Sequence, residues 1–146
     1  MSAASKVCFF YQGVRFSFSE RTKLKLFIEG LFRKEGKKLE QLNYIFCTDA
    51  ALLSINRQYL QHDYYTDIIS FDLSEGPATT GDIFISIDRV KDNAKQLDLA
   101  FRDELCRVIF HGALHLCGYG DKKPAEIKVM REKENYYLEN WRKKRK

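Results

Sequence analysis

The segment FRDELCRVIFHGALHL, residues 101–116, constrains the fold more than any other part of the sequence. At the helical spacing of about 100° per residue, its apolar side chains point in every direction around the axis. Phe110 faces one way, Leu105 another and Val108 a third. A helix that is apolar on all sides must be covered on all sides. We therefore expect residues 101–116 to form a helix buried in the centre of the protein.

The segments around this helix alternate irregularly between strand and helix patterns. KVCFFYQGVRFSF predicts two short strands joined by a hairpin at Gln12–Gly13. Periodicity and end signals predict the remaining elements: a helix between Ser19 and Gly36, a strand over 42–48, a helix over 49–60, strands over 66–73 and 81–87, a helix over 88–96, and a last helix starting at Pro124. This order indicates an α+β fold with a small mixed sheet and several helices.

Length and charge indicate one domain with a basic end. A chain of 146 residues suits a single domain. The net charge is +5, but the last five residues, RKKRK, are all basic, and without them 20 Lys and Arg residues balance 20 Asp and Glu residues. We expect a single domain over residues 1–141 and a disordered tail over 142–146. Such a tail adds salt-sensitive affinity for phosphate without giving specificity.

Other features of the sequence favour a cytoplasmic protein. No apolar run approaches the roughly 20 residues of a membrane span, and the start MSAASKVCFFYQG does not have the layout of a signal peptide. We therefore expect no membrane association. The four cysteines are widely spaced and form no CxxC pair, which argues against a zinc site made of thiolates.

His111 and His115 are four residues apart in the buried helix and lie on one stripe of it. Histidines at this spacing can both reach one zinc ion. The alternative is that they are core histidines whose ring nitrogens bond to the backbone. The chain has only three histidines, and two of them occur in its most apolar helix, where burial is unfavourable unless the rings are bonded. Gly112 stands where the HExxH pattern of zinc peptidases has a glutamate.

Asp121 and Glu104 are the acidic residues best placed to join the histidines. Gly118 can end the helix, and the turn GYGD that follows can bring Asp121 back toward the histidine stripe. A carboxylate would complete three protein ligands and leave the fourth position for water, as in catalytic zinc sites. Asp121 could equally cap the helix that starts at Pro124. Glu104 lies on the stripe two turns before His111 and could act as a general base or orient a ligand imidazole.

HGALHLCGYGD resembles the signature H-G-x-L-H-L-x-G-Y-D-H of the YbeY family of metal-dependent endoribonucleases. Further segments are similar in the same order: Glu104 stands seven residues before the first histidine, TDIISF resembles the strand T-D-V-L-S-F, and GDIFIS resembles G-D-I-x-I-S. The helix end INRQY also corresponds. The resemblance covers about residues 40–140, and several spaced motifs are more specific than HxxxH alone.

The resemblance implies a function in ribosomal RNA maturation. It implies hydrolysis of single-stranded RNA, including the 3′ end of the small-subunit ribosomal RNA, and a part in ribosome quality control. It also implies one Zn²⁺ ion held by His111, His115 and Asp121, with RNA and the ribosome as partners.

The chain departs from the family pattern at two places. Gly120 and Asp121 stand where the family commonly has D-H, so the third ligand is an aspartate, which binds zinc at a similar length. Leu60 stands where the family usually presents an arginine to the substrate, and Arg57 or His62 could supply that cation. Further side chains that could contact the substrate are Ser70, Asp67, Asp82, Tyr64, Tyr65 and Tyr119.

Two other functions compete with the endoribonuclease. A zinc peptidase or amidohydrolase shares HxxxH with a distant third ligand, but the missing glutamate argues against it. A non-catalytic module that binds RNA or the ribosome, with a structural zinc, would show the same histidine pair.

Overall fold

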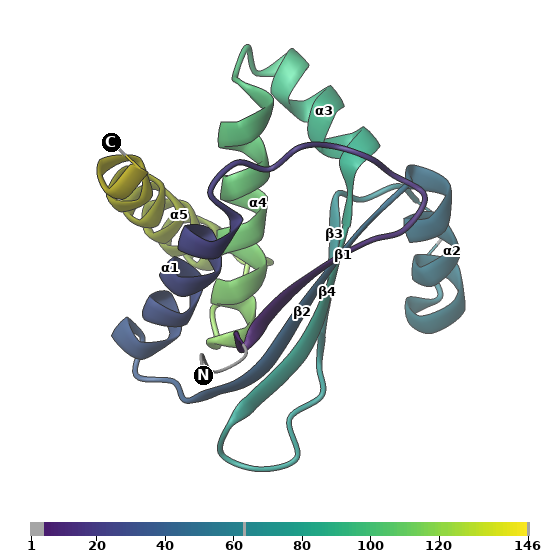
Figure 1. The fold of residues 1–146 in the computed structure, drawn as a ribbon. Helices are drawn as coiled ribbons and strands as arrows, with labels where there is room; N and C mark the ends of the chain where they lie inside the picture. The colour runs from purple at the N-terminus through teal and green to yellow at the C-terminus, as the bar shows by residue number, and fades with distance from the viewer. Residues whose placement is uncertain (1–4, 63, 146) are drawn as a thin grey trace.

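The structure is a computed structural model that describes residues 5–62 and 64–145 (Figure 1). Its elements, in chain order, are β1 Val7–Tyr11, α1 Arg21–Lys34, β2 Leu39–Cys47, α2 Asp49–Leu60, β3 Ile68–Asp72, β4 Thr79–Ser86, α3 Ile87–Gln96, α4 Phe101–Leu116 and α5 Pro124–Arg145. The predicted α+β fold with a small mixed sheet is confirmed.

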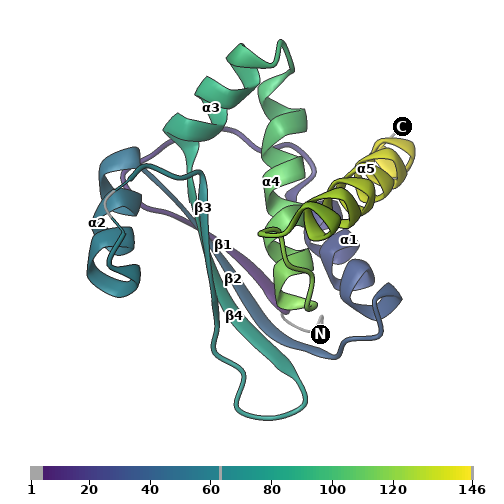
Figure 2. The ribbon, with the colours of Figure 1, turned by 180° about the vertical axis from the view of Figure 1, so that it is seen from behind.

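The four described strands form one sheet in the order β1-β2-β4-β3. β1 and β4 both run parallel to β2, whereas β3 runs antiparallel to β4. Helices α4 and α1 lie side by side against one face of the sheet, α5 packs on their outer side, and α2 covers the other face (Figures 1 and 2). Most of the core lies between the sheet and α4, and a smaller cluster around Leu52 and Ile69 fills the space under α2.

Helix α4 has the bounds and the burial that its apolar pattern predicts. Its buried side chains lie on every side of the axis and include Leu105, Val108 and Phe110. At Gly112 the helix approaches the sheet so closely that a Cβ atom would lie 2.9 Å from side-chain carbons of Ile68 and Ile83. A larger side chain at this position would require the side chains of Ile68 and Ile83 to shift.

The predicted hairpin at the N-terminus is wrong. β1 pairs with β2 in parallel, and the residues after Gly13 form no strand before α1 begins. Instead, the rings of Phe16 and Phe18 pack against Phe46 at centroid distances of 5.2 and 6.1 Å. The alternating apolar side chains thus anchor a connecting segment to the core. A connection with one side buried shows the same alternation as a strand with one face buried.

The prediction of a disordered basic tail is wrong for residues 142–145, because α5 continues to Arg145. Lysine and arginine are good helix formers and are favourable at a helix C-terminus. The last turns are anchored by Trp141, which is buried, and Arg142 lies 3.5 Å from Asp103 on α4. Lys146 lies outside the described residues.

Helix α1 lies within the predicted range and begins at Arg21. Glu20, with a positive φ of 63°, precedes the helix without a side-chain cap. The hydroxyl of Ser19 instead accepts a hydrogen bond from Arg102. None of the helices in residues 5–62 and 64–145 is long and apolar enough to cross a membrane.

Candidate metal centre

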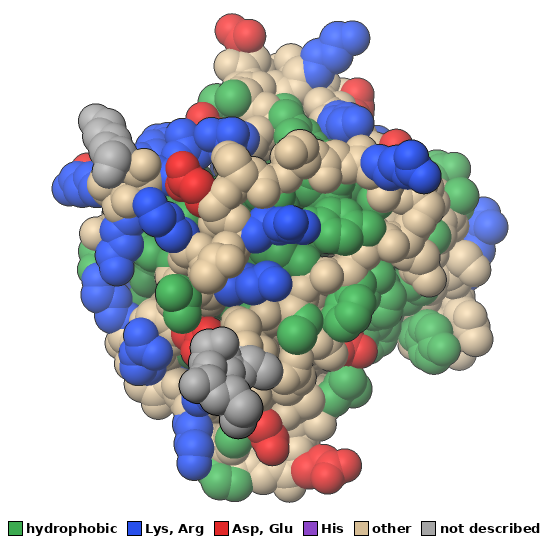
Figure 3. All heavy atoms as spheres, viewed as in Figure 1, with side chains coloured by type: hydrophobic (Ala, Val, Ile, Leu, Met, Phe, Trp, Pro, Cys, Tyr) green, Lys and Arg blue, Asp and Glu red, His purple; other side chains and the backbone are tan. Residues whose placement is uncertain are grey.

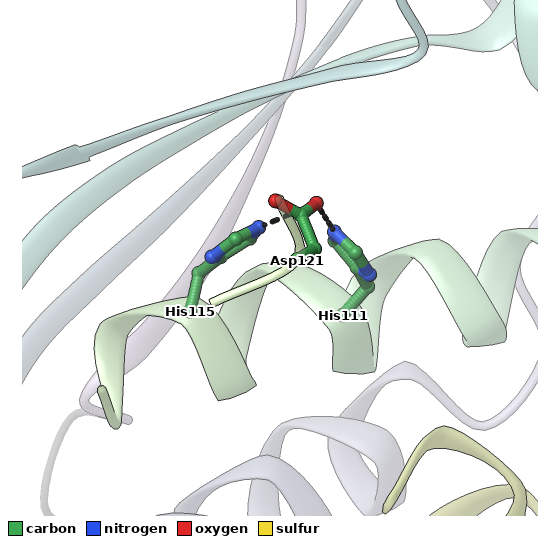
Figure 4. Close-up of side chains that lie close together, drawn as sticks. All are labelled: His111, His115 and Asp121. Atoms are coloured by element: carbon green, nitrogen blue, oxygen red, sulfur yellow. Dashed lines mark hydrogen bonds and ion pairs between the residues drawn. The ribbon is translucent and has the colours of Figure 1, made fainter. Parts of the chain in front are cut away.

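The end of α4 returns the chain toward its own histidines. Gly118 adopts a φ of 107°, which favours glycine, and the Tyr119 N–H donates to the Leu114 carbonyl oxygen at 3.1 Å. The chain therefore turns back, and Asp121 lies beside His111 and His115 (Figure 4). One ligand atom from each of these residues lies within 4.8 Å of the other two.

The distances among these atoms suit a single metal ion. Asp121 Oδ2 lies 3.2 Å from His111 Nε2 and 3.1 Å from His115 Nε2. Ligand atoms at the corners of a tetrahedron around zinc would be about 3.3 Å apart, given the usual zinc–ligand lengths. Both imidazoles are partly exposed and face a groove, so the two histidines are not simply core residues bonded to the backbone. The donor set fits a divalent metal.

Glu126 takes the capping role that Asp121 could have had. Its carboxylate accepts hydrogen bonds from the N–H groups of Lys122 and Lys123 at the start of α5. The Asp121 carboxylate is directed at the imidazoles instead.

Glu134 is a site residue that the sequence analysis missed. Its carboxylate Oε2 lies 2.6 Å from His111 Nδ1, and only 2% of the side chain is exposed. This bond leaves Nε2 of a neutral His111 as the atom with a lone pair facing Asp121. Burial raises the pKa of Glu134, but the bond to His111 and the charge of Arg107 outweigh it, so the pKa is lowered. The sequence did contain a signal for Glu134: it is a charged residue on the same stripe of α5 as the buried Met130 and Tyr137.

Arg107 connects Glu134 to the predicted residue Glu104. Its guanidinium donates to both carboxylate oxygens of Glu104, at 2.8 and 2.5 Å, and to Glu134 at 3.0 Å. Glu104 is fully buried and does not line the groove. Its carboxylate therefore contacts neither the substrate space nor an imidazole in this structure. We expected Glu104 to bond to a ligand imidazole, but Glu134 makes this bond instead, to His111.

The three donors open onto a groove of about 590 Å³ between α4 and the segment that joins α2 to β3. Several predicted substrate contacts line it, namely His62, Tyr64, Asp67 and Ser70, and so does Leu60, which stands in place of the family's arginine. The Ser70 hydroxyl is buried and has no hydrogen-bond partner among the described residues. His62 stacks on Tyr64 with ring centroids 5.1 Å apart, and its Nδ1 lies 2.9 Å from the Tyr64 hydroxyl. Burial raises the pKa of Asp67, although the charge of Arg107 acts to lower it.

Four other candidates do not line the groove. Arg57 lies on the last turn of α2, and Tyr65 packs under the guanidinium of Arg89. Asp82 accepts a hydrogen bond from Asn43, on the face of the sheet opposite α4. The Tyr119 hydroxyl donates to Glu35 at 2.6 Å, which ties the turn before Asp121 to the end of α1.

The site lies within a segment that matches a known family. The family model described as Endoribonuclease YbeY matches residues 16–142. The chain belongs to the YbeY endoribonuclease family. YbeY relatives from two bacteria are each 48% identical to it: that of Bacteroides thetaiotaomicron over 127 residues, covering 87% of this chain and 93% of the relative, and that of Cytophaga hutchinsonii over 133 residues, covering 90% and 93%.

A solved structure also shares the fold. The solution structure of TM1509 from Thermotoga maritima matches with a TM-score of 0.64 and 27% identity, covering 93% of each chain. Within the YbeY signature, Gly120 replaces the usual aspartate. A Cβ atom at Gly120 would lie 2.8–3.0 Å from the carboxyl group of Glu126, so Glu126 takes the space beside this position.

Proposed function

We propose that this chain is a zinc-dependent endoribonuclease that cuts single-stranded RNA. Its setting is ribosomal RNA maturation, including the 3′ end of the small-subunit RNA, and ribosome quality control. The proposal places the protein in the cytoplasm, where its ribosomal substrate occurs. The observation that carries the proposal is the convergence of two imidazole nitrogens and one carboxylate oxygen at the wall of an open groove.

Each side chain at the centre has a separate task. His111, His115 and Asp121 would hold one Zn²⁺ ion, and Glu134 fixes the orientation of the His111 ring. Zinc in such a site polarises a phosphoryl oxygen and lowers the pKa of water toward neutrality. The exposed edge of Arg107, which lines the groove, can donate to phosphate oxygens there. Phosphodiester hydrolysis depends chiefly on such positioning and charge neutralisation.

Packing at Gly112 disfavours the peptidase alternative. The glutamate of HExxH serves as the general base of zinc peptidases; Gly112 stands in its place, and a side chain there would have to displace Ile68 and Ile83. Cleavage of casein at a rate comparable to that of RNA would favour the peptidase.

Metal removal tests the proposal. Protein freed of metal with a chelator should leave labelled single-stranded RNA intact, and about one equivalent of Zn²⁺ should restore cleavage. A non-catalytic ribosome-binding module instead predicts RNA binding in both states and cleavage in neither.

Glu134→Gln is expected to weaken zinc binding by about 10–100-fold, because the amide holds His111 less firmly and does not enhance its basicity. Competition with a colorimetric zinc chelator measures this affinity. Glu132→Gln removes the same charge from an exposed position two residues away on α5 and should leave the affinity unchanged. Equal affinities for both variants would mean that Glu134 serves the fold alone.

His62→Ala is expected to raise the KM for single-stranded RNA several-fold with little change in kcat, because His62 lines the groove away from the three donors. Arg57→Ala should have a smaller effect, since Arg57 does not line it. Steady-state cleavage of a fluorogenic oligonucleotide separates the two parameters. If neither variant alters cleavage, neither residue replaces the cation that is missing at Leu60.

A further inference from the structure

A second groove, of about 400 Å³, runs between α1 and α5. The two helices lie side by side (Figures 1 and 2), and the groove shares no lining residue with the metal centre. Its walls come from the stretch 26–34 of α1 and from Tyr137, Asn140 and Lys144 of α5. We call it the α1–α5 groove.

The charged side chains that line the α1–α5 groove are all positive. Arg33, Lys34 and Lys144 line it, and no carboxylate from the described part of the chain does. Among residues 5–62 and 64–145, none of the three makes an ion pair: Lys34 donates to the Tyr136 hydroxyl at 2.8 Å, and Lys144 lies over the Phe27 ring. The last turns of α1 and α5 are both basic, and Figure 3 shows lysine and arginine gathered on this side of the molecule.

The groove at the metal centre has the opposite balance. Asp67, Asp72 and Asp121 line it, against Arg107 and Lys122. Arg107 is already paired with two buried carboxylates. A nucleic acid gains most of its sequence-independent affinity from cations on its phosphates. Even with a divalent ion at the metal centre, this groove offers few free cations, so a long RNA would gain further attraction from cations elsewhere on the protein.

Gly30 leaves the floor of the α1–α5 groove bare. It lies inside α1, where glycine is among the least favourable residues. A Cβ atom there would meet only the Arg33 guanidinium, at 3.6 Å, which is an ordinary contact. The packing of the protein does not require a glycine here. A bare floor lets a bulky backbone approach the helix closely.

We propose that the α1–α5 groove binds the sugar-phosphate backbone of the substrate RNA outside the segment that is cut. The proposal rests on the proposed function, since it takes the bound RNA to be the substrate. Three unpaired cations around a bare floor suit a row of phosphates. RNA is favoured over an acidic protein segment because RNA is also the polyanion that the metal centre would cleave.

Binding of a fluorescent RNA with a hairpin and a single-stranded end, measured by anisotropy with metal-free protein over a series of salt concentrations, tests this. The variant Arg33→Gln/Lys34→Gln/Lys144→Gln should bind about tenfold more weakly at low salt, with a slope of log affinity against log salt reduced by about 2. The control Lys95→Gln/Lys128→Gln/Arg131→Gln removes the same charge from exposed positions outside both grooves. It should bind within about twofold of wild type.

Gly30→Glu provides a second test that leaves the three cations in place. The variant should keep the melting temperature of the wild type, because glutamate is a better helix former than glycine. It should lose RNA affinity to a similar extent as the triple variant, whereas Gly30→Ala should retain it.

Three results would overturn the proposal: equal weakening by the two triple variants, full affinity in Gly30→Glu, or preferential binding of an acidic peptide such as polyglutamate. The last would assign the groove to a protein partner. Cleavage of a short single-stranded oligonucleotide is measured separately and should be unchanged in the groove variants. RNA binding in the groove without metal-dependent cleavage by wild type would support the groove and reject only the proposed function.

Discussion

Asp121→Ala is expected to abolish detectable RNA cleavage, whereas Asp121→His should keep it within about tenfold of wild type. The Asp121 oxygen lies between two imidazole nitrogens at 3.1 and 3.2 Å, so alanine removes one of three ligands. The loss should exceed the 10–100-fold that is typical of groups outside the ligand set. Histidine also binds zinc, and the YbeY signature has it at this position. Zinc content and cleavage rate are measured on the same preparations.

Glu75→Ala is the control, because it removes an exposed carboxylate outside the metal-centre groove and should change neither quantity. If Asp121→Ala retains both zinc and activity, the third ligand is another group. If Asp121→His loses zinc while remaining folded, the position tolerates only a carboxylate.

Arg107→Met is expected to destabilise the protein by about 3–5 kcal/mol, the usual effect of removing one partner from a buried ion pair. The guanidinium satisfies Glu104 and Glu134, whose side chains are 0% and 2% exposed. Its hydrogen bonds to Glu104 raise the pKa of Arg107, so it stays charged throughout. Urea unfolding followed by circular dichroism measures the change. A loss below about 1 kcal/mol would contradict this account of the network.

Arg89→Met is the control for that experiment. Arg89 pairs with Asp49 at 2.7 Å, but both side chains are partly exposed, at 30% and 24%. Such a pair contributes about 1 kcal/mol or less.

The stability difference between wild type and Arg107→Met should also depend on pH. The folded-state pKa of Glu134 is lowered from its usual 4.5. Its contribution is therefore present above about pH 4.5 and is lost as the pH falls through the lower folded value. The difference between the two proteins should be largest near neutral pH and should shrink below about pH 4.5.

The sequence predicts an element well when its residue pattern is compatible with only one local structure. An all-round apolar stretch has to be a covered helix, and α4 occupies residues 101–116 as expected. Gly118 predicts a reversal, and the reversal brings Asp121 to His111 and His115. Local rules of this kind need no knowledge of distant residues.

The features that could not be predicted depend on distant partners. Alternation at Phe16 and Phe18 suits both a strand and a buried connection, and the parallel pairing of β1 with β2 decides between them. Glu134 stood out only as a charge on an apolar stripe, because its partners His111 and Arg107 lie more than twenty residues away in the sequence. Helical spacing places Glu104 on the same stripe as the histidines, but it does not predict that the Glu104 carboxylate is bonded to Arg107.

The most direct test of the central claim is cleavage of a labelled single-stranded RNA, beside its duplex form, by zinc-loaded wild type and by a folded His111→Ala variant prepared identically. We predict that wild type cuts the single strand and spares the duplex, and that the variant cuts neither. Equal cutting by the two proteins would assign the activity to a contaminating nuclease. No cutting by either would leave a metal-braced module that binds RNA or the ribosome, and would contradict the endoribonuclease.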